Sequence, residues 1–352
     1  MILHTVYPGT SGATSVAVNI YQNLEKKNKE GNCLVFFGNT QLKKEYQEIF
    51  SVKKILIYKI IYNYFLLGNL KFLFLLFKIK PKTILMHNYL ILPIIFYKLF
   101  YNVKLITVFH TNLEIIQDKI KENIFFKIII FFILFFSKKI VLVNKLNKNI
   151  YIFKNYKNKI TIIHNCIEQN IFKKKNKNYK KKIVLGAAGR LVQNNKISLV
   201  IDAIFKLRKN NLKLLIAGNG PELLKLKQKV KKYKLSKKII FFGDLDKLNL
   251  INWFNKITFY IHFSKKEFMS TSILQAMSFE LPVMATDLFE NRFIYEASKT
   301  KNILVDNKIE SISHELNKLL KKKSYRCREN REFIKKNNNI EIVGKKYERL
   351  LK

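Results

Sequence analysis

The residues with the clearest chemical potential lie in one stretch, where Glu267 is followed eight positions later by Gln275. Between them, Ser270 and Thr271 have side chains that cap a helix start, and the free N–H groups of such a start suit a phosphate. Gln275 lies one turn into that helix, so its amide can face the same pocket as the Glu267 carboxylate. Together they suit the hydroxyls of a sugar or a ribose. The alternative for Glu267 is a plain surface acid, although the chain has only 24 acidic residues against 66 basic ones.

A second polar group follows a predicted strand at 183–188. Gly189 permits a sharp turn at the strand end. Arg190 and Lys196 come next. The guanidinium of Arg190 is a planar fork, the ammonium of Lys196 is a point charge, and both can bind a diphosphate. The alternative is two surface cations. That alternative is stronger for Lys196, because the chain is rich in lysine and has only seven arginines.

Glycines mark the ends of two further predicted strands. Gly218-Asn219-Gly220-Pro221-Glu222 follows the strand at 212–217, and Gly243 ends the strand at 239–243. These glycines leave room for a ligand to approach the backbone. A tight strand-to-helix turn with a proline at the helix start would have the same sequence.

The elements that must position these residues alternate between short apolar runs and longer helical stretches, which is the pattern of parallel sheets covered by helices. In the first half, strands are expected at 2–7, 33–37, 83–87, 105–110, 140–143 and 161–164, with helices at 15–27 and 88–100. In the second half, strands are expected at 183–188, 212–217, 239–243, 259–263, 282–286 and 302–305, with helices at 196–209, 222–233, 271–279 and 309–320. A pair of basic helices is expected from about residue 325 to the end.

The length of 352 residues predicts two α/β domains. We place an N-terminal domain at 1–172, a lysine-rich linker at 173–182 and a C-terminal domain at 183–330, with a helical tail at 331–352 that packs back across the cleft between the domains. Ligands of such sheets bind outside the carboxyl ends of the strands, where the polar residues described above lie.

The net charge of +42 has three interpretations. It reflects a lysine-biased composition on solvated faces, attraction to an anionic membrane surface or polyanionic substrate, or binding to nucleic acid. Lysine rather than arginine carries the charge, which disfavours sequence-specific recognition of nucleic acid. No specific nucleic-acid partner is therefore expected.

The opening residues do not have the charged start and apolar run of a signal peptide, and three widely spaced cysteines fit a reduced, cytoplasmic compartment. The most apolar run, 125–136, has only 12 residues and contains Lys127, whereas a spanning helix needs about 20. The stretch 60–79 contains Asn63, Asn69 and Lys71. Both runs indicate either buried elements or a face that dips into lipid headgroups.

Several ordered segments share a family pattern, namely residues 9–13, 108–111, 163–168, 189–191, 217–222, 241–243 and 267–286. In this order and spacing they resemble the retaining glycosyltransferases of family 4, which have the GT-B fold of two Rossmann-like parallel-sheet domains facing a cleft. The resemblance implies transfer of a hexosyl-type sugar from a nucleoside-diphosphate sugar to a glycan or lipid-linked acceptor. It also implies retention of configuration and no cofactor or obligatory metal.

The resemblance also assigns roles to residues. His110 and Glu267 are implied to act at the reacting sugar, and Gln275 takes the place of the second Glu of the family's Glu-x7-Glu motif, which binds ribose. The donor is implied to be bound by Gly12, Arg190, Lys196, Gly218, Gly243, Met269, Ser270, Thr271, Ser272 and Gln275. Such a site works by stabilising the negative charge that grows on the departing diphosphate.

Four positions depart from the family pattern: Gln275 replaces an acid, Phe268 stands where Gly is usual, Asn195 occupies the lysine position next to Lys196, and Leu288 follows Thr286-Asp287 in place of a Gly-rich turn. Two alternatives therefore stay open, a degenerate protein that binds nucleotide sugar without turnover and a sugar-nucleotide epimerase. A dehydrogenase is disfavoured because Gly-x-Gly-x-x-Gly does not follow the first strand. The expected setting is synthesis of surface polysaccharide, lipopolysaccharide or glycolipid, in the cytoplasm or peripherally on the inner face of the membrane.

Overall fold

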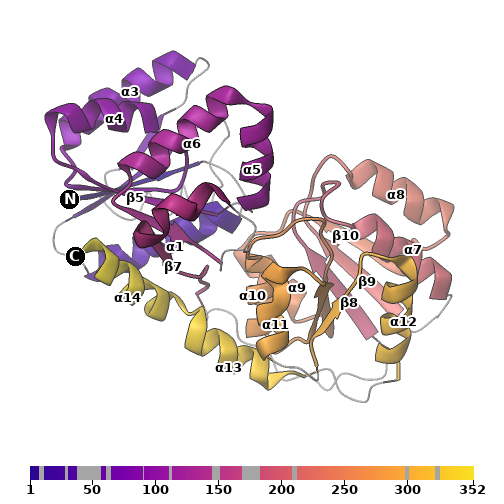
Figure 1. The fold of residues 1–352 in the computed structure, drawn as a ribbon. Helices are drawn as coiled ribbons and strands as arrows, with labels where there is room; N and C mark the ends of the chain where they lie inside the picture. The colour runs from indigo at the N-terminus through magenta and orange to yellow at the C-terminus, as the bar shows by residue number, and fades with distance from the viewer. Residues whose placement is uncertain are drawn as a thin grey trace. The chain divides into compact units, whose positions relative to one another are not determined.

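The chain folds into two α/β units, seen here in a computed structural model (Figure 1). The structure describes residues 1–7, 12–27, 31–37, 57–60, 65–89, 91–110, 113–144, 151–168, 183–207, 212–297, 301–321 and 326–352. The N-terminal unit consists of residues 1–166 and 340–352, and the C-terminal unit of residues 167–339. The linker predicted at 173–182 lies outside the described residues.

The N-terminal unit is built on a seven-stranded sheet in the order β3-β2-β1-β4-β5-β6-β7, in which every neighbouring pair is parallel. Its strands are β1 (Ile2–Val6), β2 (Asn32–Phe37), β3 (Ile57–Ile60), β4 (Thr83–Met86), β5 (Lys104–Phe109), β6 (Lys139–Leu142) and β7 (Ile160–Ile162). Six of them confirm predicted strands to within two residues at each end. The edge strand β3 was missed because its four residues run into the apolar stretch that starts at Ile60.

Helices cover both faces of this sheet. They are α1 (Gly12–Lys27), α3 (Phe65–Ile79), α4 (Ile91–Phe100), α5 (Leu113–Glu122), α6 (Ile124–Phe136) and α14 (Ile340–Leu351), with the 3-10 segment η1 (Tyr151–Lys159) before β7. α3 contacts α4 and α4 contacts α6, whereas α1 contacts α14. The two apolar runs noted in the sequence, 60–79 and 125–136, thus correspond to the helices α3 and α6.

The C-terminal unit has a six-stranded parallel sheet in the order β10-β9-β8-β11-β12-β13. Its strands are β8 (Ile183–Ala188), β9 (Leu212–Ala217), β10 (Ile239–Gly243), β11 (Phe259–His262), β12 (Val283–Thr286) and β13 (Ile303–Val305). All six were predicted, because strands buried on both faces read as continuous apolar runs bounded by polar residues. The two parallel sheets confirm the predicted fold class.

The helices of this unit are α7 (Ile197–Leu207), α8 (Leu223–Lys232), α9 (Lys247–Phe254), α10 (Thr271–Ser278), α11 (Arg292–Ala297), α12 (Ile309–Leu319) and α13 (Arg328–Asn337), with a 3-10 turn η3 (Phe289–Asn291) before α11. α7 shows why they form: Ile197, Val200, Ile201 and Ile204 recur at helical spacing and are all buried in the main core. Ser198, Asp202 and Lys206 are polar residues outside this core, and Phe205 is an exposed apolar one. α9 starts at Asp246, whose carboxylate accepts the N–H of Asn249.

The two basic helices predicted at the end of the chain are confirmed as α13 and α14. α13 packs against α10 and α11 in the C-terminal unit, and α14 packs against α1 in the N-terminal unit. The tail is therefore divided between the units, with the division after residue 339 rather than at residue 331.

The described part of the chain has no helix with the length and hydropathy required to cross a membrane.

Candidate active site

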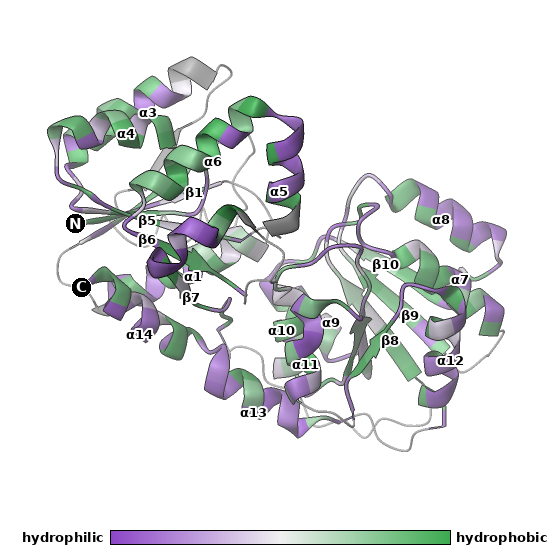
Figure 2. Ribbon diagram, in the orientation of Figure 1, coloured by the Kyte–Doolittle hydropathy of each residue, from purple (hydrophilic) through white to green (hydrophobic). Residues whose placement is uncertain are grey.

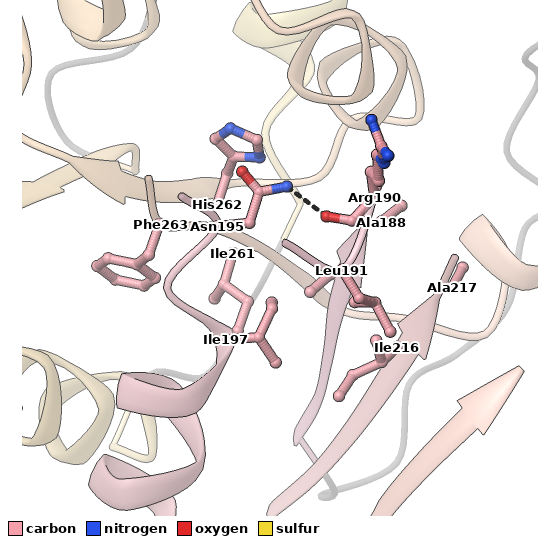
Figure 3. A pocket seen from close by; sticks show the side chains of 12 residues that line it. Ala188, Arg190, Leu191, Asn195, Ile197, Ile216, Ala217, Ile261, His262 and Phe263 are labelled. Carbon is pink, nitrogen blue, oxygen red and sulfur yellow. Dashed lines mark hydrogen bonds between the residues drawn. The ribbon is translucent and has the colours of Figure 1, made fainter. Parts of the chain in front are cut away.

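A pocket opens at the point where the strand order of the C-terminal sheet reverses, between β8 and β11. The chain leaves β8 toward β9 on one side and returns to β11 on the other, so the loops at the carboxyl ends of β8 and β11 diverge there. The pocket is open to solvent, and it is lined by Ala187, Ala188, Gly189, Arg190, Leu191, Asn195, Ile197, Ile216, Ala217, Ile261, His262 and Phe263 (Figure 3). Its polar side chains come from Arg190, Asn195 and His262, and its floor is apolar.

Arg190 is the cation of this pocket. Its side chain is exposed, and its guanidinium has no ion pair or hydrogen bond within the described residues. The Arg190 backbone is held, because its carbonyl accepts the side-chain Nδ2–H of Asn195 at 2.7 Å (Figure 3). A fixed backbone and an unengaged guanidinium suit the capture of an anion.

The residue at the pocket beside Arg190 is Asn195 and not Lys196. Asn195, which the resemblance places at the position of the family lysine, braces the Arg190 loop through its hydrogen bond to the Arg190 carbonyl. Lys196 is half-buried, lies outside the pocket lining, and donates its backbone N–H to the Phe263 carbonyl at 2.8 Å. The lysine role that the resemblance implies for Lys196 stays a prediction.

Gly218 serves the packing of two neighbouring turns. Its φ is +127°, and a Cβ at this position would lie 2.0 Å from the Gly189 carbonyl oxygen. The two turns are tied by a hydrogen bond from the Leu191 N–H to the Asn219 carbonyl. Gly218 also donates its N–H to the Gly243 carbonyl. The backbone of the chain itself therefore fills the space beside Gly218. This packing favours the alternative named above, in which the glycine serves a tight strand-to-helix turn rather than a ligand.

Glu267 is locked in place by two hydrogen bonds. His262 Nε2 lies 2.6 Å from Glu267 Oε2, and the N–H of Phe268 donates to Oε1 at 3.0 Å. Burial raises the pKa of this carboxyl, but the hydrogen bonds and charge of His262 and the Phe268 N–H outweigh burial, so the net pKa is lowered. Glu267 is thus ionised at neutral pH and can accept hydrogen bonds from a ligand.

The loop that carries Glu267 is braced from the Arg190 side. Asn194 accepts the backbone N–H of Lys266 and donates to the Lys266 carbonyl. Asn195 itself forms a bridge with Ser264. The two loops around the pocket are therefore one hydrogen-bonded assembly, which holds the Glu267 carboxylate at a fixed place relative to Arg190.

Helix α10 begins directly after this loop. Ser270 caps it, and its Oγ accepts the Ile273 N–H and lies 2.9 Å from the Ser272 Oγ. The first turn leaves backbone N–H groups of Thr271 and Ser272 outside the helix ladder. Met269, which precedes the helix, is buried, and Gln275 on α10 is half-buried. The Phe268 side chain is buried as well, with 4% of its surface exposed.

This half of the chain matches a known family. Residues 168–340, nearly the whole C-terminal unit, match the model of the group named "Glycosyl transferases group 1". The C-terminal unit is thus a glycosyltransferase domain of the group 1 type, and the chain as a whole has the GT-B fold. A comparison with curated proteins finds no significant match.

Several solved structures share the fold of this chain along its whole length. HepE from Anabaena in complex with UDP-glucose is 12% identical, with 99% of this chain and 98% of that chain covered and a TM-score of 0.81. The lipopolysaccharide outer core galactosyltransferase WaaB is 15% identical, with coverages of 100% and 99% and a TM-score of 0.73. Sucrose-phosphate synthase from Thermosynechococcus elongatus is 13% identical, with coverages of 99% and 98% and a TM-score of 0.80.

His262 and Asn194 shape the site without having been predicted to do so, and Asn195 was named only as a departure from the family lysine. The signal for His262 was its place at the end of a predicted strand, five residues before Glu267. The contact itself could not be predicted, because it depends on a loop that folds back toward the strand end.

The remaining predicted site residues lie in the N-terminal unit. Gly12 is the first residue of α1, and residues 8–11 before it lie outside the described chain. His110 follows β5, and its Nε2 lies 2.8 Å from the Nδ1 of His87, which follows β4. Their rings are nearly parallel, and the ring of His4 on β1 also stacks with that of His87.

These three imidazoles are neutral at pH 7. Burial lowers the pKa of His4 to about 3 and that of His110 to about 4, where a hydrogen bond with Asn165 opposes the shift. Burial also lowers the pKa of His87 well below its usual value, and His110 and His4 add to this effect. Because neither ring of the His87–His110 contact is protonated twice, one nitrogen must donate and the other accept. The tautomers of His87 and His110 are therefore coupled, so that a proton on His87 Nδ1 requires the His110 proton to be on Nδ1.

Proposed function

We propose that this glycosyltransferase moves a hexosyl-type sugar from a nucleoside-diphosphate sugar to a glycan or lipid-linked acceptor with retention of configuration. The observation that carries the proposal is the pocket at the strand reversal, where Arg190 is available to an anion and His262 holds the Glu267 carboxylate beside the start of α10. This arrangement offers a cation, helix N–H groups and a fixed carboxylate within one braced pair of loops.

The donor chemistry follows from these groups. Arg190 would bind the diphosphate as a fork, and the N–H groups of Met269 to Ser272 would face phosphate or sugar. Gln275 has no side-chain hydrogen bond within the described residues, so its amide is available to the ribose hydroxyls. HepE, which shares the fold, was solved with UDP and with UDP-glucose. A uridine donor is therefore the first to test.

The reaction needs stabilisation of the departing diphosphate. The positive charge of Arg190 at the pocket and the N–H groups at the start of α10 would act where negative charge grows. Glu267 would hold a sugar hydroxyl, and His110 would approach the reacting sugar, as the family resemblance implies. We propose that no metal or cofactor is required, and activity that persists in excess EDTA would support this.

The proposed acceptor belongs to surface polysaccharide, lipopolysaccharide or glycolipid synthesis, at the cytoplasmic face of a membrane. WaaB, which shares the fold, is described as a lipopolysaccharide outer core galactosyltransferase. The proposed partners are therefore a nucleotide-sugar donor, a glycan or lipid-linked acceptor and an anionic membrane surface.

Calorimetric titration of the purified protein with UDP and with a panel of nucleoside-diphosphate sugars tests this function. We expect saturable binding of at least one donor and slow hydrolysis or transfer of its sugar, with the anomeric configuration read by NMR. Failure to bind any common donor would overturn the proposal.

Gln275 favours a second candidate function, which is donor binding without turnover. A neutral amide accepts hydrogen bonds from ribose more weakly than the carboxylate it replaces. If this candidate holds, the protein binds donor but neither transfers nor hydrolyses it, and Gln275→Glu restores transfer. Product analysis without acceptor separates both functions from an epimerase.

A further inference from the structure

The outer surface of the N-terminal helix layer is unusually apolar. More than half of the exposed large apolar side chains in the described chain lie on just three helices, α3, α4 and α6. Figure 2 shows α6 as hydrophobic over most of its length, whereas α8 and α13 in the C-terminal unit are mainly hydrophilic. The apolar character is thus a feature of one face of one unit.

Helix α6 is apolar on two opposite sides. Ile130, Ile133 and Leu134 are buried against the unit. The exposed residues recur at helical spacing along the outer side and are Ile124, Phe125, Ile128, Phe131 and Phe135. Packing within the unit explains only the first side, since a surface helix of a soluble domain normally has a polar outer stripe.

The neighbouring helices continue this outer stripe. Leu92, Phe96, Leu99 and Phe100 are exposed on α4, and Leu70 and Phe74 on α3. α3 contacts α4, and α4 contacts α6, so the stripes lie side by side. We name these exposed apolar side chains of α3, α4 and α6 the outer apolar face. A patch that spans three helices exceeds what scattered surface residues produce.

The charges on these helices have one sign only. α3, α4 and α6 contain no Asp or Glu, whereas Lys71, Lys78 and Lys127 are exposed on them. A lysine stem can lie along an apolar surface while its ammonium group reaches phosphate oxygens. Phenylalanine and leucine combined with lysine, without acids, is the composition of a surface that lies in a membrane interface.

We propose that the outer apolar face docks on an anionic lipid bilayer, with the aromatic side chains of α3, α4 and α6 among the acyl chains near the headgroups and the three lysines on lipid phosphates. This inference deepens the proposed membrane contact and does not depend on glycosyl transfer. It assigns the contact to the N-terminal unit and leaves the donor pocket of the C-terminal unit outside the contact surface. In this arrangement α3, α4 and α6 lie on the surface of the membrane.

Vesicle flotation tests the docking surface. The full-length protein is mixed with vesicles of phosphatidylcholine alone or of phosphatidylcholine with about one third phosphatidylglycerol. We expect binding to the anionic vesicles and a loss of about tenfold or more in the variant Phe74→Gln/Phe125→Gln/Phe131→Gln, because three inserted rings are removed. The matched control is Leu224→Gln/Leu248→Gln, which replaces two equally exposed apolar residues of the C-terminal unit and should bind like the wild type.

The lysines are tested separately. Lys71→Gln/Lys78→Gln/Lys127→Gln should weaken binding to anionic vesicles several-fold, whereas Lys225→Gln/Lys231→Gln/Lys232→Gln on α8 should have a smaller effect. Thermal unfolding and donor titration of every variant establish that the fold and the donor pocket are intact. These readouts also distinguish failure of docking from failure of the proposed activity.

Three outcomes would overturn the proposal. The phenylalanine variant could bind anionic vesicles as tightly as the control, which would show attraction by general charge alone. The wild type could fail to bind either kind of vesicle. Light scattering could show a dimer that the phenylalanine variant abolishes, which would assign the outer apolar face to a second copy of the chain.

Discussion

His262 Nε2 and Glu267 Oε2 lie 2.6 Å apart, so a residue at the end of β11 holds the proposed sugar-binding carboxylate of the following loop. We expect His262→Ala to lower kcat/KM for the donor by about tenfold to a hundredfold, which is the usual cost of removing a hydrogen bond to a charged group. Steady-state kinetics together with donor calorimetry would measure the loss. His262→Gln retains a hydrogen-bond donor and should recover part of it, whereas His262→Leu fills similar space without a donor and should not.

The pH dependence of the same variant provides an independent check. In the wild type, hydrogen bonds lower the pKa of Glu267 against the effect of burial. This carboxylate therefore contributes stability above its ordinary pKa, and the contribution is lost as pH falls through the lowered value. Without His262, burial dominates and the pKa rises. The acid limb of the kcat/KM profile should then move to higher pH, and an unmoved limb would contradict the assignment.

Arg190 should contribute more to donor binding than Lys196, because Arg190 lines the pocket and Lys196 does not. Arg190→Ala should weaken UDP binding by at least about tenfold, since a charge-assisted contact to the diphosphate is lost. Lys196→Ala is the matched control, and calorimetry with UDP measures both. An equal or larger effect at Lys196 would show that its ammonium reaches the diphosphate despite its place outside the lining.

Gly218→Ala should destabilise the C-terminal unit by about 2–4 kcal/mol, because the new Cβ collides with the Gly189 carbonyl and φ is positive. Gly243→Ala has a positive φ but meets no atom within 4 Å, so it should cost only about 1 kcal/mol. Urea unfolding followed by the fluorescence of Trp253, the single tryptophan, reports on this unit. Similar costs for the two variants would show that the turns separate to admit the methyl group.

The stacked histidines should make the N-terminal unit sensitive to acid. His4 and His110 have lowered pKa values of about 3 and about 4, so between those values and about 6.5 the unfolded chain binds protons that the folded unit does not. Stability is therefore complete above the ordinary histidine pKa and falls as pH decreases, by up to about 1.4 kcal/mol per pH unit for each histidine. Urea midpoints between pH 7 and 4.5 would measure this slope.

The variant His4→Phe keeps a ring between Tyr21 and His87 but cannot bind a proton, so it should reduce the acid slope by about one histidine. His314 is exposed on α12, and His314→Gln should leave the slope unchanged. A slope that is the same in the wild type and His4→Phe would show that His4 is protonated inside the folded unit.

Much of the fold could be predicted from the sequence, and the reason is local. Buried parallel strands such as β8 and β9 are continuous apolar runs with polar ends, so their bounds can be read without knowledge of their partners. β3 and α9 were not predicted, because each is short and its pattern is weak. The division of the tail also escaped prediction, since α13 and α14 are both basic amphipathic helices and only packing decides which unit each joins.

For the site, the sequence by itself determined the group 1 relationship, the positions of Arg190, Glu267 and Gln275 at strand and helix ends, and the surplus of lysine. Only the tertiary structure decided that His262 holds Glu267 and that Asn195 rather than Lys196 lies at the pocket. It also decided that Gly218 packs against the Gly189 carbonyl. It also revealed that α3, α4 and α6 join their outer stripes into one apolar face. The physical reason is the same in each case: residue type and local period determine what a segment can form, whereas contacts between distant segments depend on how the sheets bring their loops and helices together.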